Sequence, residues 1–213
     1  MGGRNGAQLA VDDLNAAGGL QGQPLVLIPK DDEQKTDVAR AQLKALADAG
    51  VTLVVGPMSS AVAVAVRDYA TELGLVLISP TASAPELVGH DDALFCLAPN
   101  ARASAAQHAE FLYRQGVRTI ATLAETQNKA FTYSWVQGVQ ARMLALGGQY
   151  RPEVQYASTP GVNFAALAQQ MVAARAQAIL LVANAADSAM LVQQIRRHDE
   201  RVLLTLTPWA ANE

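Results

Sequence analysis

Two short loops rich in hydroxyl groups are the part of this chain best suited to binding an acid. The first is Gly56-Pro57-Met58-Ser59-Ser60, which leads directly into a helical pattern, and the second is Ser79-Pro80-Thr81-Ala82-Ser83-Ala84-Pro85. A helix N-terminus presents free backbone N–H groups and attracts negative charge, so Ser59 and Ser60 would suit a ligand carboxylate. The alternative is that either serine only caps its own helix.

Both loops follow apolar runs that we expect to be strands, at residues 51–55 and 75–78. In open parallel sheets, ligands collect beyond the carboxyl ends of the strands. We therefore expect the two loops to face one shared gap, with a small acid docking on the loops of Ser60 and Ser83.

Further strand-end loops lie in the second half of the chain. Residues 125–135 concentrate amide, hydroxyl and aromatic groups in a chain with only 5% aromatic residues, and Phe131 or Tyr133 would close over a ligand. The loops at 184–187 and 208–209 also follow expected strands. These segments are the candidates for the opposite wall of the gap.

Catalytic signals are weak. The sequence contains no G-x-S-x-G elbow, no P-loop and no G-x-G-x-x-G motif. Asp31 and Asp32 follow an expected strand and would suit acid–base chemistry, but no nucleophile accompanies them, and such a run is typical of a solvated turn. The histidines, His90, His108 and His198, lie away from the strand ends. We therefore expect no enzyme, no metal site and no cofactor.

Composition indicates a packed α/β protein. Of 213 residues, 51% are hydrophobic and 16% are charged, which suits helices packed on parallel sheets and argues against disorder. The formal net charge is −3 and no basic stripe is present, so we do not expect nucleic acid as a partner. Apolar runs such as residues 178–183 have the length of strands, far below the roughly 20 residues of a membrane helix.

Helical and strand patterns alternate along nearly the whole chain, which is the pattern of βαβ units and a parallel sheet. Helices are expected over residues 7–17, 37–49, 60–73, 101–115, 132–146, 164–174 and 187–198. Strands are expected over residues 25–28, 51–55, 75–78, 94–97, 117–123, 149–156, 178–182 and 202–206. Two successive runs predict two doubly wound, Rossmann-like lobes: an N-terminal lobe over 1–100, a C-terminal lobe over 101–207 and the start of a hinge return at 208–213.

Five ordered motifs resemble the type I periplasmic binding proteins, in particular the branched-chain amino-acid receptors that feed ABC importers. They are Asn15-Ala16-Ala17-Gly18-Gly19-Leu20-Gln21-Gly22 with Pro24, Asp31-Asp32, Gly56-Pro57-Met58-Ser59-Ser60, the stretch from Leu77 to Leu87, and Ala145-Leu146-Gly147-Gly148. The resemblance implies two lobes joined by three hinge crossings, with a ligand held between them without chemical conversion. It also implies a periplasmic or extracytoplasmic location and an ABC permease as the receiver of the ligand.

The resemblance assigns roles to the residues of the N-terminal lobe. Ser60, with Ser59 beside it, would hold the ligand carboxylate. Thr81 and Ser83, with Ala82 between them, would contact an α-ammonium group through backbone carbonyl and hydroxyl oxygens.

In the C-terminal lobe, the resemblance places Phe131 where an aromatic ring covers the ligand and Asn184 near a second aromatic position. The acidic residue that would pair with an ammonium group falls near Trp209, which carries no charge. Trp209 and Phe131 therefore suggest a flat or apolar acid, such as an aromatic carboxylate, stacked between rings.

The chain opens on a helix and ends just after a strand, and we interpret it as truncated at both ends. Residues 1–6 lack the apolar core of a secretion signal. In the related family, the strand that would precede residue 7 lies inside the first sheet. Without it, strands 25–28 and 51–55 would keep unpaired backbone groups, so we expect re-pairing, cover by another chain, or a marginally stable N-terminal lobe.

Three functions stay open at this point. The leading one is a solute-binding protein that closes over a small carboxylate or amino-acid-like ligand for an ABC importer. The second is a ligand-sensing domain of a fused membrane receptor, such as a histidine kinase or chemoreceptor. The third is an α/β enzyme that uses Asp31 and Asp32. A homodimer is a further assembly to test.

Overall fold

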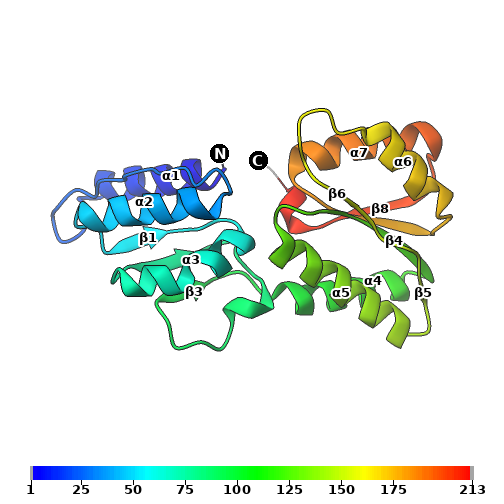
Figure 1. Ribbon diagram of the computed structural model, residues 1–213, viewed down its shortest axis with the longest axis horizontal. Coiled ribbons are helices and arrows are strands. Elements are labelled where there is room, and N and C mark those ends of the chain that lie inside the picture. The colour runs from blue at the N-terminus through cyan, green and yellow to red at the C-terminus, as the bar shows by residue number, and fades with distance from the viewer. Residues whose placement is uncertain (1, 212–213) are drawn as a thin grey trace.

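The computed structural model describes residues 2–211, which form two α/β lobes (Figure 1). Each lobe is built around its own parallel sheet, with strand order β1-β2-β3 in the N-terminal lobe and β5-β4-β7-β8 in the C-terminal lobe. This architecture confirms the predicted fold class. The chain passes from the first sheet to the second between β3 and α4, while the proposed lobe boundaries stay a prediction.

In the N-terminal lobe, the strands and helices pack around a small core of alanine, valine and leucine side chains. Its helices are α1 (Gly2–Ala16), α2 (Thr36–Asp48) and α3 (Ser60–Glu72), and its strands are β1 (Leu53–Val55), β2 (Val76–Ser79) and β3 (Leu94–Cys96), with the short 3-10 helix η1 (Pro85–Leu87) between β2 and β3. β2 is central, because Leu77 pairs with Val54 on one side and with Leu94 on the other.

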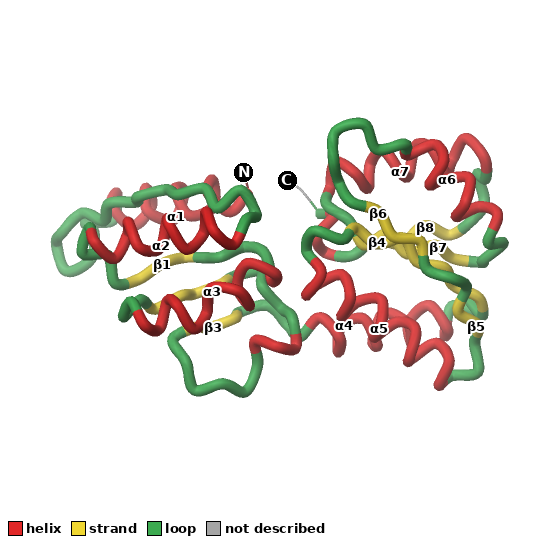
Figure 2. The backbone as a smooth tube through the Cα atoms, viewed as in Figure 1, coloured by secondary structure: helices red, strands yellow, loops and turns green. Residues whose placement is uncertain are grey.

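The C-terminal lobe is a three-layer sandwich. Its sheet lies between α4 with α5 on one face and α6 with α7 on the other (Figure 2). The strands are β4 (Thr119–Glu125), β5 (Gln149–Tyr150), β6 (Val154–Tyr156), β7 (Ala178–Val182) and β8 (Leu203–Leu206), and the helices are α4 (Ala101–Arg114), α5 (Lys129–Ala145), α6 (Phe164–Ala173), α7 (Ala185–His198) and the 3-10 helix η2 (Pro208–Ala210). β7 is buried throughout, as a continuous apolar strand between two helical layers should be.

Glycines end several helices. The chain leaves α3 through Gly74 at φ +69° and α4 through Gly116 at φ +91°, in the left-handed region that glycine adopts without steric cost. Within residues 2–211, no helix combines the length and the apolar character needed to cross a bilayer.

The strand expected over residues 149–156 is divided in two. β5 pairs with the start of β4, β6 pairs with its end, and residues 151–153 between them belong to neither strand. Pro152 lies in this interruption. Proline has no backbone N–H, so within a continuous strand it would break the hydrogen-bond ladder.

The prediction of a strand at residues 25–28 is wrong, since these residues form no strand in the described structure. Among the described residues, the hydrogen bonds of this segment join only Leu25 to the Asn15 side chain, at 2.7 and 2.9 Å. β1 is the edge of its sheet, and a groove of about 300 Å³ lies between β1 and residues 26–30. Val26 and Leu53 are 81% and 55% exposed. An apolar run becomes a strand only beside a partner, and here the neighbouring position is open.

Candidate functional site

The two hydroxyl loops of the N-terminal lobe meet at the carboxyl ends of β1 and β2. Ser79, the last residue of β2, is fully buried and joins them. Its hydroxyl donates to the Pro57 carbonyl oxygen at 2.5 Å and accepts from the Ala82 backbone N–H at 3.0 Å. The interpretation of the sequence missed this role, although the position of Ser79 at a strand end is a signal that could have found it.

Ser60 and Ser83 lie side by side, as expected for loops at neighbouring strand ends. The Ser83 backbone N–H donates to the Ser60 hydroxyl oxygen at 3.0 Å, and both residues are buried. Ser60 is also the first residue of α3, so its hydroxyl stands at a helix N-terminus. A serine hydroxyl that accepts one hydrogen bond keeps its own proton for a second acceptor.

Thr81 and Ala82 complete the second loop. Thr81 is exposed, and its hydroxyl donates to the Met58 carbonyl oxygen at 2.7 Å. Ala82 is fully buried beside Ser79. The loops are therefore tied to each other by hydrogen bonds of Ser60, Ser79 and Thr81, which gives a fixed surface where a ligand can dock.

Asn128 brings the C-terminal lobe to this surface. It lies directly before α5, and its side-chain oxygen accepts from the Ser59 hydroxyl at 3.2 Å and from the Ala61 backbone N–H at 3.1 Å. Asn128 is buried in this position. The sequence interpretation included it in a candidate loop but did not assign it a contact, because its partners are 67 and 69 residues away.

Phe131 and Trp209 contact each other in the C-terminal lobe. Their ring centroids are 5.8 Å apart with an interplanar angle of 78°, an edge-to-face arrangement. Phe131 is buried and also lies 6.1 Å from the Trp135 ring, whereas Trp209 is half-buried. The exposed part of Trp209 is the aromatic surface that this pair offers.

Asn184 caps α7, because its side-chain oxygen accepts from the Asp187 backbone N–H at 2.9 Å. The Asp187 carboxylate in turn accepts from the Tyr156 hydroxyl at 2.8 Å. Burial raises the pKa of Tyr156, and the hydrogen bond to Asp187 raises it further. Tyr156 therefore keeps its proton and acts as a donor at the end of β6.

Asp31 and Asp32 form turns. Asp31 accepts from the Glu33 N–H at 2.9 Å, and Asp32 accepts from the Gln34 N–H at 2.8 Å. Aspartates commonly bond to the backbone two residues ahead in this way. The arrangement gives the two carboxylates a local role in shaping the loop.

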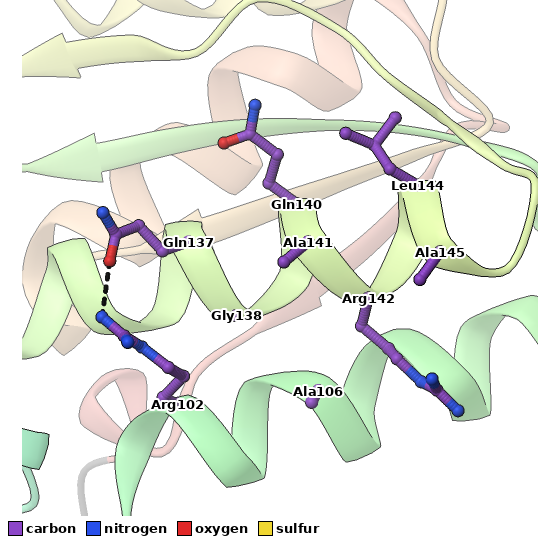
Figure 3. Close-up of a pocket in the computed structure, with 9 residues that line it drawn as sticks. All are labelled: Arg102, Ala106, Gln137, Gly138, Gln140, Ala141, Arg142, Leu144 and Ala145. Carbon is purple, nitrogen blue, oxygen red and sulfur yellow. Dashed lines mark hydrogen bonds between the residues drawn. The ribbon is translucent and has the colours of Figure 1, made fainter.

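A groove of about 580 Å³ lies elsewhere, on α4 and α5 (Figure 3). It is lined by Arg102, Ala106, Gln137, Gly138, Gln140, Ala141, Arg142, Leu144 and Ala145, and the Arg102 guanidinium donates to the Gln137 side-chain oxygen at 2.6 Å. None of the candidate residues lines this groove. It lies on helix surfaces, whereas ligands of parallel sheets bind at strand ends, so the loops of Ser60 and Ser83 are the better candidate site.

Known proteins share this architecture. A family model described as "Periplasmic binding protein" matches residues 1–205. Over 86 residues the chain is 45% identical to the Leu/Ile/Val-binding protein BraC3 of Rhizobium johnstonii, a match that covers 39% of this chain and 23% of that protein.

Two solved structures share the fold. One is the branched-chain amino acid transporter substrate binding protein LivJ from Streptococcus pneumoniae, in complex with isoleucine. It has a TM-score of 0.81 and 24% sequence identity, and the match covers 96% of this chain and 58% of the LivJ chain. A solute binding protein of an ABC transporter from Rhodopseudomonas palustris, in complex with 3,4-dihydroxybenzoic acid, has a TM-score of 0.80 and 18% identity, with coverage of 93% and 54%. The chain thus spans less than two thirds of the length of each relative named.

Proposed function

Because the chain belongs to the periplasmic binding protein family, we propose that it captures a small carboxylate between its lobes as part of an extracytoplasmic solute-binding protein. The observation that carries this proposal is the hydrogen bond from the Ser83 backbone to the Ser60 hydroxyl at the N-terminus of α3. It brings two hydroxyl loops and a helix N-terminus to one point, and such a point attracts anions.

The ligands in the names of the relatives support the carboxylate. Leucine, isoleucine, valine and 3,4-dihydroxybenzoic acid differ in shape and charge, but each carries this group. In the C-terminal lobe, Glu125 and Asp187 already accept hydrogen bonds from backbone N–H groups and from Tyr156. An α-amino acid also carries an ammonium group that needs an acidic partner, and Trp209, at the position where that partner would lie, is uncharged. An aromatic or apolar acid therefore suits this lobe better than an α-amino acid.

The proposed mechanism is closure of the two lobes. The acid docks first on Ser59, Ser60 and the loop of Thr81, Ala82 and Ser83. The C-terminal lobe, which already contacts this surface through Asn128, then closes further. It buries the ligand beside Asn184 and the exposed part of Trp209, whose ring contacts the buried Phe131. Since a ligand selects the state it binds better, its affinity depends on the contacts that exist only when the lobes are closed.

The partner in this proposal is an ABC permease, and the location is the periplasm or an equivalent extracytoplasmic space. Two relatives are named as components of transporters, which favours transport over the sensing domain of a histidine kinase or chemoreceptor. The relatives named are binding proteins, which supports binding without catalysis. We also propose lobes at 1–100 and 101–207, with 208–213 starting a hinge return.

The double variant Ser60→Ala and Ser83→Ala tests the function. It removes the hydroxyl that stands at the α3 N-terminus and the one beside it, so we expect the Kd to rise at least about tenfold, the loss of one or two hydrogen bonds to a charged group. Titration calorimetry with leucine, isoleucine and 3,4-dihydroxybenzoic acid provides the measurement. Thr71→Ala, at an exposed position near the other end of α3, serves as the control.

Two outcomes would count against the proposal. One is an unchanged Kd in the double variant. The other is the absence of binding to all three acids in the unmodified chain.

A further inference from the structure

The N-terminus of α3 is capped by the opposite lobe. Its own N-cap residue, Ser59, makes no side-chain hydrogen bond to the helix, while Asn128 accepts from the Ala61 N–H and the Ser59 hydroxyl. Helix N-termini carry orphan N–H donors, and an asparagine side chain is among the best groups to satisfy them. Asn128 performs this role across the gap between the lobes.

The same residue is not used to cap its own helix. Asn128 holds the N-cap position of α5, yet its side chain makes no capping hydrogen bond there. Instead, the buried Glu125 carboxylate accepts from the Gln127 N–H at 2.6 Å and from the Asn128 N–H at 3.2 Å. The Glu125 carboxylate therefore fixes the Asn128 backbone and leaves its amide group to reach α3.

We propose that Asn128 is a specificity-determining residue whose amide oxygen occupies the place of the ligand carboxylate until an acid displaces it. The inference rests on the proposed function, because it assumes that the acid binds at the N-terminus of α3. A tethered group competes at an effective concentration on the order of millimolar or more. A neutral ligand would replace the hydrogen bonds of the Asn128 amide oxygen with bonds of similar strength, so it does not displace Asn128.

A carboxylate does better for a physical reason. Hydrogen bonds to a charged acceptor are roughly twice as strong as those between neutral groups, and the helix dipole adds to the attraction for an anion. Asn128 thus allows acids to bind at the N-terminus of α3 and excludes the corresponding neutral amides or esters.

Two substitutions of Asn128 should act in opposite directions. Asn128→Ala removes the competitor, so the Kd for 3,4-dihydroxybenzoic acid or isoleucine should fall about fivefold, the equivalent of one net hydrogen bond. Asn128→Asp places a charged competitor at the same point and should raise the Kd about tenfold. Gln140→Ala, on the same helix with an exposed side chain and far from the candidate loops, should leave the Kd unchanged.

The direction of these changes separates the inference from its alternatives. If Asn128 contacted the ligand, or only supported the fold, Asn128→Ala would weaken binding, and that result would overturn the proposal. Asn128→Asp is nearly isosteric and supplies a second test if the alanine variant folds poorly. Tighter or equal binding by Asn128→Asp would also overturn it.

A measurement without ligand tests the contact itself. In the free chain, Asn128→Ala should speed hydrogen exchange of the Ala61 amide at least about threefold, and Gln140→Ala should not, because exchange reports local hydrogen bonding. Unchanged exchange at Ala61 would overturn the inference even where the chain binds acids. Failure of the unmodified chain to bind any acid would instead contradict the proposed function.

Discussion

Ser79 is the residue that holds the candidate site together. Its hydroxyl bridges the Pro57 carbonyl and the Ala82 N–H, one from each hydroxyl loop, and it is inaccessible to water. Buried polar groups that lose their partner keep the full cost of leaving water. The geometry of the Ser60 and Ser83 contact therefore depends on a side chain that does not itself face the ligand.

Ser79→Ala should lower the free energy of unfolding by about 1–3 kcal/mol, since it leaves the buried Ala82 N–H and the half-buried Pro57 carbonyl oxygen without this partner. Urea denaturation of the N-terminal lobe measures this change. Thr71→Ala, at an exposed position in the same lobe, should stay within about 0.5 kcal/mol of the unmodified chain, as surface substitutions usually do. If Ser79→Ala matched that control, the bridging role would be refuted.

The candidate site could be predicted from the sequence only where it depends on the order of neighbouring strands within one lobe. Loops that follow neighbouring parallel strands must meet at one edge, and the contact between Ser60 and Ser83 follows that rule. The contact of Asn128 with Ala61 does not, because it depends on how two lobes are placed in space. Asparagine before a helix predicts a cap on that helix, and here it caps another one.

At the scale of elements, the alternating helical and strand patterns located most helices and strands. β7 matches its predicted range because five consecutive apolar residues between two helices have one favourable place, the centre of a parallel sheet. The prediction failed at residues 25–28, where the pattern was equally apolar. Burial of that run depends on a neighbouring strand, which its own residues cannot supply.

The open edge of β1 predicts uneven stability. Alternate residues of a parallel strand bond to each neighbour, and Thr52 and Gly56 bond to β2, so Leu53 and Val55 point their backbone groups to the groove. We expect amides of β1 to exchange at least about tenfold faster than those of β7 in monomeric protein. Residue-resolved hydrogen exchange measures both, and equal protection in the two lobes would contradict this account.

At the scale of the whole molecule, the order of five weak motifs was more informative than any of them alone. The family inferred from those motifs is confirmed by the match over residues 1–205, and the two-lobed α/β fold is confirmed by the parallel sheets. The ligand cannot be predicted in the same way. Relatives with this fold are named for aliphatic amino acids and for an aromatic acid, so the fold leaves the choice to a few side chains.

The central claim is that an acid binds where the loops of Ser60 and Ser83 meet at the N-terminus of α3. The most direct measurement is a titration of isotope-labelled protein with leucine, isoleucine and 3,4-dihydroxybenzoic acid, followed by backbone amide NMR signals. We expect at least one acid to shift the signals of Ser60, Ala61 and Ser83, while Gly138 and Ala141 in the groove on α4 and α5 stay in place. Shifts confined to that groove, or no shift with any of the three acids, would contradict the claim.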